Sequence, residues 1–265
     1  MRSFLILNLR SMNDLPLVER WLLKDHAAET LAMNGPILDR YTSYRAVPAP
    51  RGAEAYGYYN WRLTEHWWRE NPFRGQGQMD QGTSFAETWP PNYTDILGLP
   101  SGEARSSKWG GTPDGKHPPV KMFIPRRPSE DFKGKGLTMA DGTVLRWVVA
   151  IKYPEGVSQE EGDHWYINVH APEVCKQPGL KRFFSFGKIA PSTTLFVRIS
   201  ELWYENAEAW TRSVIEEPQE YTRPAWAQDD RYPFLEPFVD MFGTFILEAP
   251  TNDFLRDWNG YVFTS

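Results

Sequence analysis

The chain has 265 residues, of which 41% are hydrophobic and 24% are charged, a balance typical of a folded globular protein. Its net charge of −5 gives no electrostatic reason to expect a nucleic-acid partner, since binding along phosphates needs clustered Lys and Arg. A single cysteine, Cys175, excludes an internal disulfide and favours a reducing cytoplasmic location, and no apolar run approaches the roughly 20 residues that span a membrane.

Taken in chain order, the first elements are a buried strand and a helix. Residues 4–9 form a short apolar run typical of a strand, and Asp14 with Pro16 marks the start of a helix. Two further strands, a short helix and a last strand are predicted at residues 37–45, 56–61, 65–70 and 120–124. The first half therefore predicts the order β-α-β-β-α-β, which is the ferredoxin-like arrangement.

A long excursion precedes the last of these strands. Residues 72–119 are rich in Gly, Pro, Ser and Asn and also contain Trp89. A loop of this length in a compact domain is usually functional or disordered, and its aromatic residues favour a folded flap over a ligand. Aromatic residues make up 15% of the chain, which also favours a ring-lined cavity.

The second half repeats the first at an offset of about 144 residues. The shared pattern is Trp-x4-His-x8-Gly, at Trp21, His26 and Gly35 and again at Trp165, His170 and Gly179. The second copy predicts strands at 145–152, 180–186, 195–203 and 243–247, with helices that begin near Ser158 and Glu205. The predicted fold class is α+β, with two tandem ferredoxin-like units at 1–130 and 145–265 and a linker at 131–144.

The second copy carries a recognisable motif. Residues 165–172 read Trp-Tyr-Ile-Asn-Val-His-Ala-Pro and are followed by Gly179-Leu180, a pattern that resembles the EthD-like branch of the dimeric α/β-barrel superfamily. The first copy keeps Trp21 and His26 but has Ala28 in place of the Pro. The resemblance implies that the two units pack sheet to sheet into one intramolecular barrel and that small, often aromatic ligands bind between sheet and helices. Relatives include monooxygenases, cyclases, isomerases, decarboxylases and haem-binding branches, so the fold alone does not define the reaction.

The two histidines are the strongest candidates for catalysis. His26 and His170 each follow an apolar or aromatic residue by four positions, which places the imidazole on the inward side of its helix. Because its usual pKa is near 6.5, a histidine can accept and donate protons near neutral pH. We expect His170 to be the general acid and base because its motif is fuller, with His26 next; a structural role for either is the alternative.

Two arginines on the predicted second strands could bind an anion. Arg40 and Arg182 lie near the end of each helix, and a guanidinium suits a carboxylate or an enolate. An outward-facing Arg in a salt bridge is an equally good interpretation. Further predicted substrate-binding residues are Trp165, Trp21, Tyr41, Tyr58, Asn168, Arg198, Trp203 and Trp89.

The predicted function is a cofactor-independent isomerase. No metal-binding pair, dinucleotide-binding glycine pattern or phosphate-binding loop appears in the sequence, so neither a metal nor a cofactor is expected. The expected reaction is a double-bond, cis–trans or lactone-type isomerisation of a small anionic aromatic ring-cleavage product or related enol, in aromatic catabolism. Alternatives are a decarboxylase or dehydratase of the same substrates, a non-catalytic aromatic-ligand binding protein and a haem-dependent oxidase. The expected partner is a small-molecule substrate, with a homodimer possible.

Overall fold

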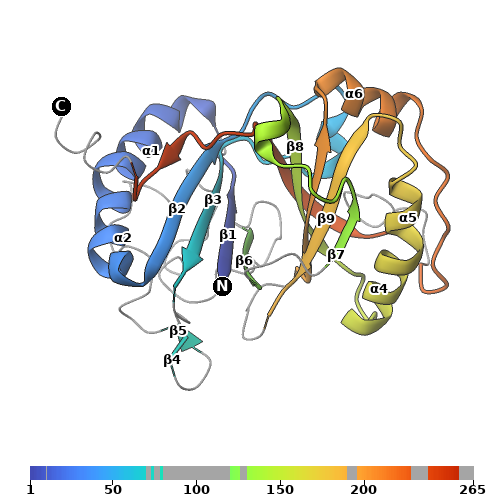
Figure 1. Cartoon of the computed structure of the whole chain (residues 1–265), viewed down its shortest axis with the longest axis horizontal. Coiled ribbons are helices and arrows are strands. Elements are labelled where there is room, and N and C mark those ends of the chain that lie inside the picture. The colour runs from blue at the N-terminus through green and yellow to red at the C-terminus, as the bar shows by residue number, and fades with distance from the viewer. Residues whose placement is uncertain are drawn as a thin grey trace.

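The computed structural model describes residues 1–9, 11–69, 73–74, 78–79, 120–125, 130–189, 196–227 and 238–256. Two sheets face each other at the centre, and helices cover the outer face of each sheet (Figure 1). Within these residues, no helix has both the length and the apolar character needed to cross a membrane.

The first unit follows the predicted order with one correction. Its strands and helices are β1 (Arg2–Leu7), α1 (Leu15–Trp21), α2 (Ala27–Asn34), β2 (Leu38–Arg45), β3 (Arg62–Trp68), the short β4 (Phe73–Arg74) and β5 (Gln78–Met79), and β6 (Val120–Ile124). The predicted strand at 56–61 and helix at 65–70 are wrong, because residues 62–68 are the central strand β3. Buried charged residues at 62 and 65 interrupt the apolar pattern of this strand, so the sequence pattern does not predict it.

The second unit agrees more closely with its prediction. Its elements are β8 (Leu145–Lys152), α4 (Gln159–Trp165), α5 (Ala171–Val174), β9 (Leu180–Gly187), β10 (Arg198–Tyr204), α6 (Ala207–Thr211) and β11 (Asp240–Ile246). The predicted helix start at Ser158 is confirmed, since Ser158 Oγ accepts a hydrogen bond from the Glu161 backbone N–H at 3.1 Å.

Both sheets have the ferredoxin-like strand order. The first runs β12-β2-β3-β1-β6 and the second runs β11-β8-β10-β9-β7, and all the pairings are antiparallel. Read from the same end, four strands of each sheet take the equivalent order, with β2, β3, β1 and β6 matching β9, β10, β8 and β11. The predicted α+β class with two tandem units is therefore confirmed.

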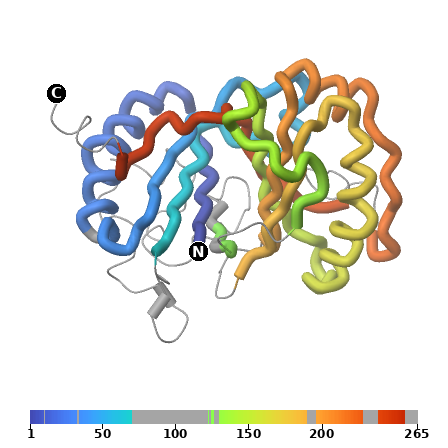
Figure 2. Tube along the Cα trace, in the orientation of Figure 1, coloured from blue at the N-terminus to red at the C-terminus, as the bar shows by residue number. Residues whose placement is uncertain are grey.

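The fifth strand of each sheet lies outside the four strands that the two sheets share. The strand β7 (Glu130–Lys133) covers the start of the predicted linker and pairs with β9 of the second unit. The strand β12 (Asn252–Asp253) comes after β11 in the second unit, yet it pairs with β2 of the first unit. Figure 2 shows this crossing as the red segment that returns to the first sheet. Each of these two strands contacts a buried arginine. Arg62 Nη1 donates to Asn252 Oδ1 of β12 at 2.9 Å, and Arg198 pairs with Glu130 of β7. The strand β12 thus ties the end of the second unit to the first sheet.

We expect Asn252→Ala to weaken the attachment of β12 to the first sheet. The buried Arg62 would lose one acceptor, which costs about 1–3 kcal/mol in free energy of unfolding. The neighbouring variant Thr251→Ala removes an exposed contact to the Arg45 backbone N–H and should change it by less than about 0.5 kcal/mol. Urea unfolding of both variants checks the prediction, and equal losses would contradict it.

The sheets pack through a shared apolar core but do not form one closed barrel. Phe4 and Ile6 of β1 meet Val148, Phe184 and their neighbours from the second unit between the sheets. One seam is joined by the main chain, where Tyr59 N–H donates to the Gly243 carbonyl at 2.6 Å. The two five-stranded sheets otherwise remain separate, and β4 and β5 form a small third sheet, which corrects the expected closed barrel.

Glycine is required at this seam. Gly57 has a φ of 66°, and a Cβ at this position would clash with the backbone oxygen of Met241. The close approach of the two chains therefore depends on the absence of a side chain here.

Candidate active site

Each predicted histidine ends a single wide turn of π-helix. Residues 22–26 form this turn between α1 and α2, and residues 166–170 form the same turn between α4 and α5. Such turns inside α-helices are rare and often occur at functional sites. The turn directs His26 toward the sheet, where its ring lies 4.6 Å from the Trp21 ring and its residue is only 6% exposed.

A buried polar stripe continues from His26 along α2. Thr30 and Asn34 follow at spacings of four residues, so all three lie on one face of the helix. Their residues are 2% and 1% exposed, which places this polar face inside the protein. We call His26, Thr30 and Asn34 the helix stripe.

The sheet contributes two more polar residues to this layer. Tyr41 of β2 and His66 of β3 are register partners, and their rings lie 4.5 Å apart. Ser3 Oγ lies 3.3 Å from His66 Nδ1, and the Tyr41 ring also packs on Phe254. The Thr30 hydroxyl is near enough to the Tyr41 hydroxyl to oppose, in small part, the rise that burial causes in the Tyr41 pKa. The two oxygens are nevertheless too far apart for a hydrogen bond of normal length.

Three buried polar atoms of this layer have no hydrogen-bond partner within the part of the chain that the structure describes. They are Thr30 Oγ1, Asn34 Oδ1 and the Tyr41 hydroxyl. A buried polar group left without a partner costs about 1–3 kcal/mol, and native proteins contain few of them. Their concentration at one helix–sheet interface marks this layer as a candidate ligand site.

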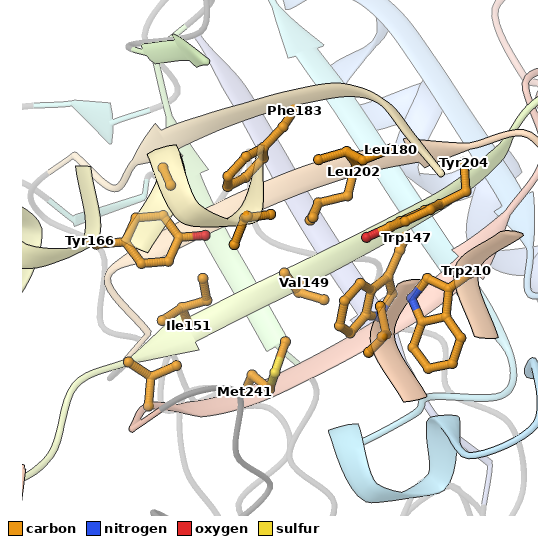
Figure 3. Packing of buried hydrophobic residues seen from close by; sticks show 14 of the residues in the cluster. Trp147, Val149, Ile151, Tyr166, Leu180, Phe183, Leu202, Tyr204, Trp210 and Met241 are labelled. Atoms are coloured by element: carbon orange, nitrogen blue, oxygen red, sulfur yellow. The ribbon is translucent and has the colours of Figure 1, made fainter. Parts of the chain in front are cut away.

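Three polar positions of this layer are occupied by apolar residues in the second unit. Val174 stands where the first unit has Thr30, and Phe183 pairs with Leu202 in the register that joins Tyr41 and His66. Figure 3 shows Phe183 and Leu202 within the packed side chains of this core. The two units therefore share a fold and a histidine but differ in the chemistry beside that histidine.

His170 is enclosed by aromatic rings. Its ring lies 5.0 Å from Trp165, 5.1 Å from Tyr166 and 5.2 Å from Tyr221. The segment that carries Tyr221 is held over the helix by Thr222, whose backbone N–H donates to Glu173 at 2.9 Å. Among the described residues, His170 Nδ1 has no hydrogen-bond partner.

Burial keeps both histidines neutral. It lowers the pKa of His26 from 6.5 to about 4, against a small opposing effect of Glu29, and lowers the pKa of His170 to about 3. A neutral imidazole at pH 7 can accept a proton, and the surroundings favour its prompt release.

These two pKa values predict a loss of stability in mild acid. Between pH 6.5 and the folded pKa values, the unfolded chain binds protons at His26 and His170 that the folded chain does not, so stability falls as pH falls. Each histidine should contribute a loss of about 2 kcal/mol between pH 7 and pH 5. Urea unfolding at both pH values checks this, with His170→Leu as the comparison. The variant should lose less stability on acidification than the wild type; equal losses would contradict the prediction.

The structure places Arg40 and Arg182 away from the histidines. Arg182 packs over the Trp203 ring at 4.9 Å, on the face between the sheets, and alternation along β2 puts Arg40 on the corresponding face. Each already has a carboxylate partner, since Arg40 lies 3.6 Å from Asp253 and Arg182 lies 3.3 Å from Asp131. These arginines are not brought together with either imidazole.

Arg198 does lie on the helix-facing side, but its donors are in use. It contacts Asp163 at 3.0 Å and donates from Nε to Ser185 Oγ at 3.0 Å. Arg62 is its counterpart in the first unit and pairs with Glu19 at 2.6 Å. Burial opposes ionisation of Glu19, but the Arg62 guanidinium outweighs it and lowers the pKa of that carboxyl to about 2.

The other predicted site residues are scattered. The Tyr58 hydroxyl donates to the Val47 carbonyl at 2.7 Å, and Trp203 lies between the sheets. Asn168 is exposed and donates to the His164 carbonyl at 2.9 Å, and Trp89 falls outside the described residues. In the described ranges, no cluster of three His, Cys, Asp or Glu side chains could hold a metal ion.

Sequence reasoning missed Thr30, Asn34 and His66 as members of this layer. The repeat of four between His26, Thr30 and Asn34 is visible in the sequence. Polar residues at helical spacing usually indicate a solvated face, however, so only their burial distinguishes this stripe.

A family model matches the first part of the chain. The family model of the chalcone isomerase N-terminal domain matches residues 1–102. No curated protein matches the sequence.

The chain is similar to several solved structures at low identity. An ethyl tert-butyl ether D (EthD) family protein from Bacillus halodurans is 22% identical, with 27% of this chain and 72% of that chain covered and a TM-score of 0.24. An anthrone oxidase-like protein is 11% identical, with 95% and 92% covered and a TM-score of 0.41. A putative monooxygenase from Lactobacillus acidophilus is 12% identical, with 94% of each chain covered and a TM-score of 0.33. The family match includes His26, the helix stripe and Tyr41, and it ends before the second unit begins.

Proposed function

We propose that this protein is an isomerase that transfers a proton within a small aromatic enone or enol, bound between α2 and the first sheet. The observation that carries the proposal is a buried, neutral His26 beside unpartnered polar side chains, in the unit that matches an isomerase domain. His26 replaces His170 as the preferred proton carrier because the second unit has apolar residues at the positions of Thr30, Tyr41 and His66.

The chemistry assigned to His26 is a pair of proton transfers. The neutral imidazole takes a proton from a carbon next to the substrate carbonyl, and the electron pair moves into an enolate. The imidazolium then returns the proton at a different atom, which gives a product of equal mass. Burial disfavours the imidazolium, so it is a short-lived carrier rather than a resting state.

The electrostatics favour an uncharged substrate over the anion expected from the sequence. The buried cation on this side of the first sheet, Arg62, is bound by Glu19, and Arg40 lies on the other face. The proposal also includes an EthD-like origin for both units. In this proposal the second unit keeps the fuller motif, and the first unit performs the reaction.

The test is a time course of the full chain with a panel of chalcones, ring-opened dienoates and lactones, followed by NMR and mass spectrometry in D₂O. Conversion to an isomer, with deuterium at one position only, supports the proposal. A change in mass beyond that exchange would indicate lyase or hydrolase chemistry. Saturable binding without conversion would indicate a binding protein, and a Soret band in the purified protein would overturn the cofactor-free reaction.

A further inference from the structure

The unpartnered atoms of the first unit differ in what they can bind. Asn34 Oδ1 can only accept a hydrogen bond, whereas the hydroxyls of Thr30 and Tyr41 can donate or accept. A ligand carbonyl could satisfy the hydroxyls but would leave Asn34 Oδ1 without a donor. A ligand hydroxyl can donate to Asn34 and accept from Tyr41 at the same time.

These atoms also lack net charge. Burial raises the pKa of Tyr41, so its hydroxyl stays protonated, and Thr30 and Asn34 do not ionise. A carboxylate or phenolate brought here would lose its hydration without meeting a cation, because Arg62 is bound by Glu19. The neutral hydroxyl of a phenol or alcohol is the ligand group that this set of atoms fits.

We propose that Thr30, Asn34 and Tyr41 form a binding site for an uncharged hydroxyl group on an aromatic ligand, and act as positioning residues for the reaction at His26. The positioning role rests on the proposed function, but the binding site is argued from the chemistry of its own atoms. The contrast with Val174 and Phe183 supports it, because the same fold packs well without hydroxyls at these two positions. The first unit keeps polar groups here although they lower its stability. A ligand that forms hydrogen bonds with these groups explains why they are kept.

The first test compares two unreactive ligands, 4-phenylphenol and 4-methoxybiphenyl; in the second a methoxy group, which cannot donate a hydrogen bond, replaces the hydroxyl. Titration calorimetry of the full chain should show that 4-phenylphenol binds more tightly. Tyr41→Phe and Thr30→Val introduce the residue types of the second unit. Each should lower the affinity for 4-phenylphenol by about 3- to 10-fold and leave the affinity for the ether unchanged. Equal weakening of both ligands, no preference for the hydroxyl, or no binding of either would overturn the proposal.

The second test is thermal unfolding without ligand. Tyr41→Phe should leave the Tm unchanged or raise it, because the hydroxyl it removes has no partner in the described part of the chain. The matched control is Tyr204→Phe in the second unit, where an equally buried hydroxyl donates to Gln177 Oε1 at 2.6 Å; its Tm should fall. An equal fall in Tyr41→Phe would show a structural hydroxyl and overturn the site.

The two proposals can fail separately. If 4-phenylphenol shows the expected pattern and no substrate is isomerised, the hydroxyl site stands and the isomerase does not. If isomerisation occurs and Tyr41→Phe changes neither kcat nor KM, the isomerase stands and the positioning role does not.

Discussion

His26→Ala should lower kcat for the isomerisation by about 10²- to 10⁴-fold, the usual contribution of a positioned general acid and base. Removing the imidazole takes away the group that carries the proton, while the apolar contacts of the layer remain. His170→Ala is the matched control, because His170 ends the same π-turn in the second unit and is similarly buried. Its kcat should stay close to that of the wild type. Loss of turnover in His170→Ala alone would move the active site to the second unit.

The pH profile distinguishes proton transfer from a structural role of His26. The base must be neutral in the free enzyme, so kcat/KM should stay level from pH 7 to about pH 5 and fall as pH drops through the His26 pKa of about 4. Rates are to be measured within seconds of dilution into acid, because stability also declines there. A fall centred near pH 6.5 would show an exposed histidine at work instead.

Arg146→Met should destabilise the protein by about 3–5 kcal/mol, because it leaves the buried carboxylate of Glu201 without its cation. Arg146 Nε contacts Glu201 Oε1 at 2.6 Å, and the two side chains are 1% and 3% exposed. Burial opposes ionisation of Glu201, but Arg146 outweighs it and lowers the pKa of that carboxyl. The first unit repeats the pair as Arg2 and Glu65 at 3.1 Å. Both pairs lie between the sheets, where they help to set how the units face each other.

The double variant Arg146→Met/Glu201→Leu should recover much of the lost stability, since neither charge is then buried alone. Arg212→Met, which removes a partner of the exposed Glu208, should change the free energy of unfolding by less than about 0.5 kcal/mol. Urea unfolding of the four proteins decides the matter. A double variant as unstable as Arg146→Met would mean that Arg146 acts mainly through packing, such as its contact with the Tyr44 ring at 4.9 Å.

Local patterns predicted most of the fold. The offset of about 144 residues matches the structure closely, since residues 22–26 and 166–170 form the same turn and the two sheets share a strand order. Strand β3 was misplaced because its buried charged residues are satisfied by partners distant in sequence, such as Glu19 for Arg62. A propensity argument cannot see such a partner.

The sequence by itself determined the α+β class, the two tandem units and the pair of equivalent histidines, because these follow from local periodicity and from repetition. Only the tertiary structure decided that β12 of the second unit joins the first sheet and that Arg40 lies on the face of the sheet away from His26. It also decided that the polar stripe of α2 lies inside and not on the surface. The pairing of distant strands, the burial of side chains and the satisfaction of hydrogen bonds depend on residues brought together from distant parts of the chain, and no local pattern encodes them.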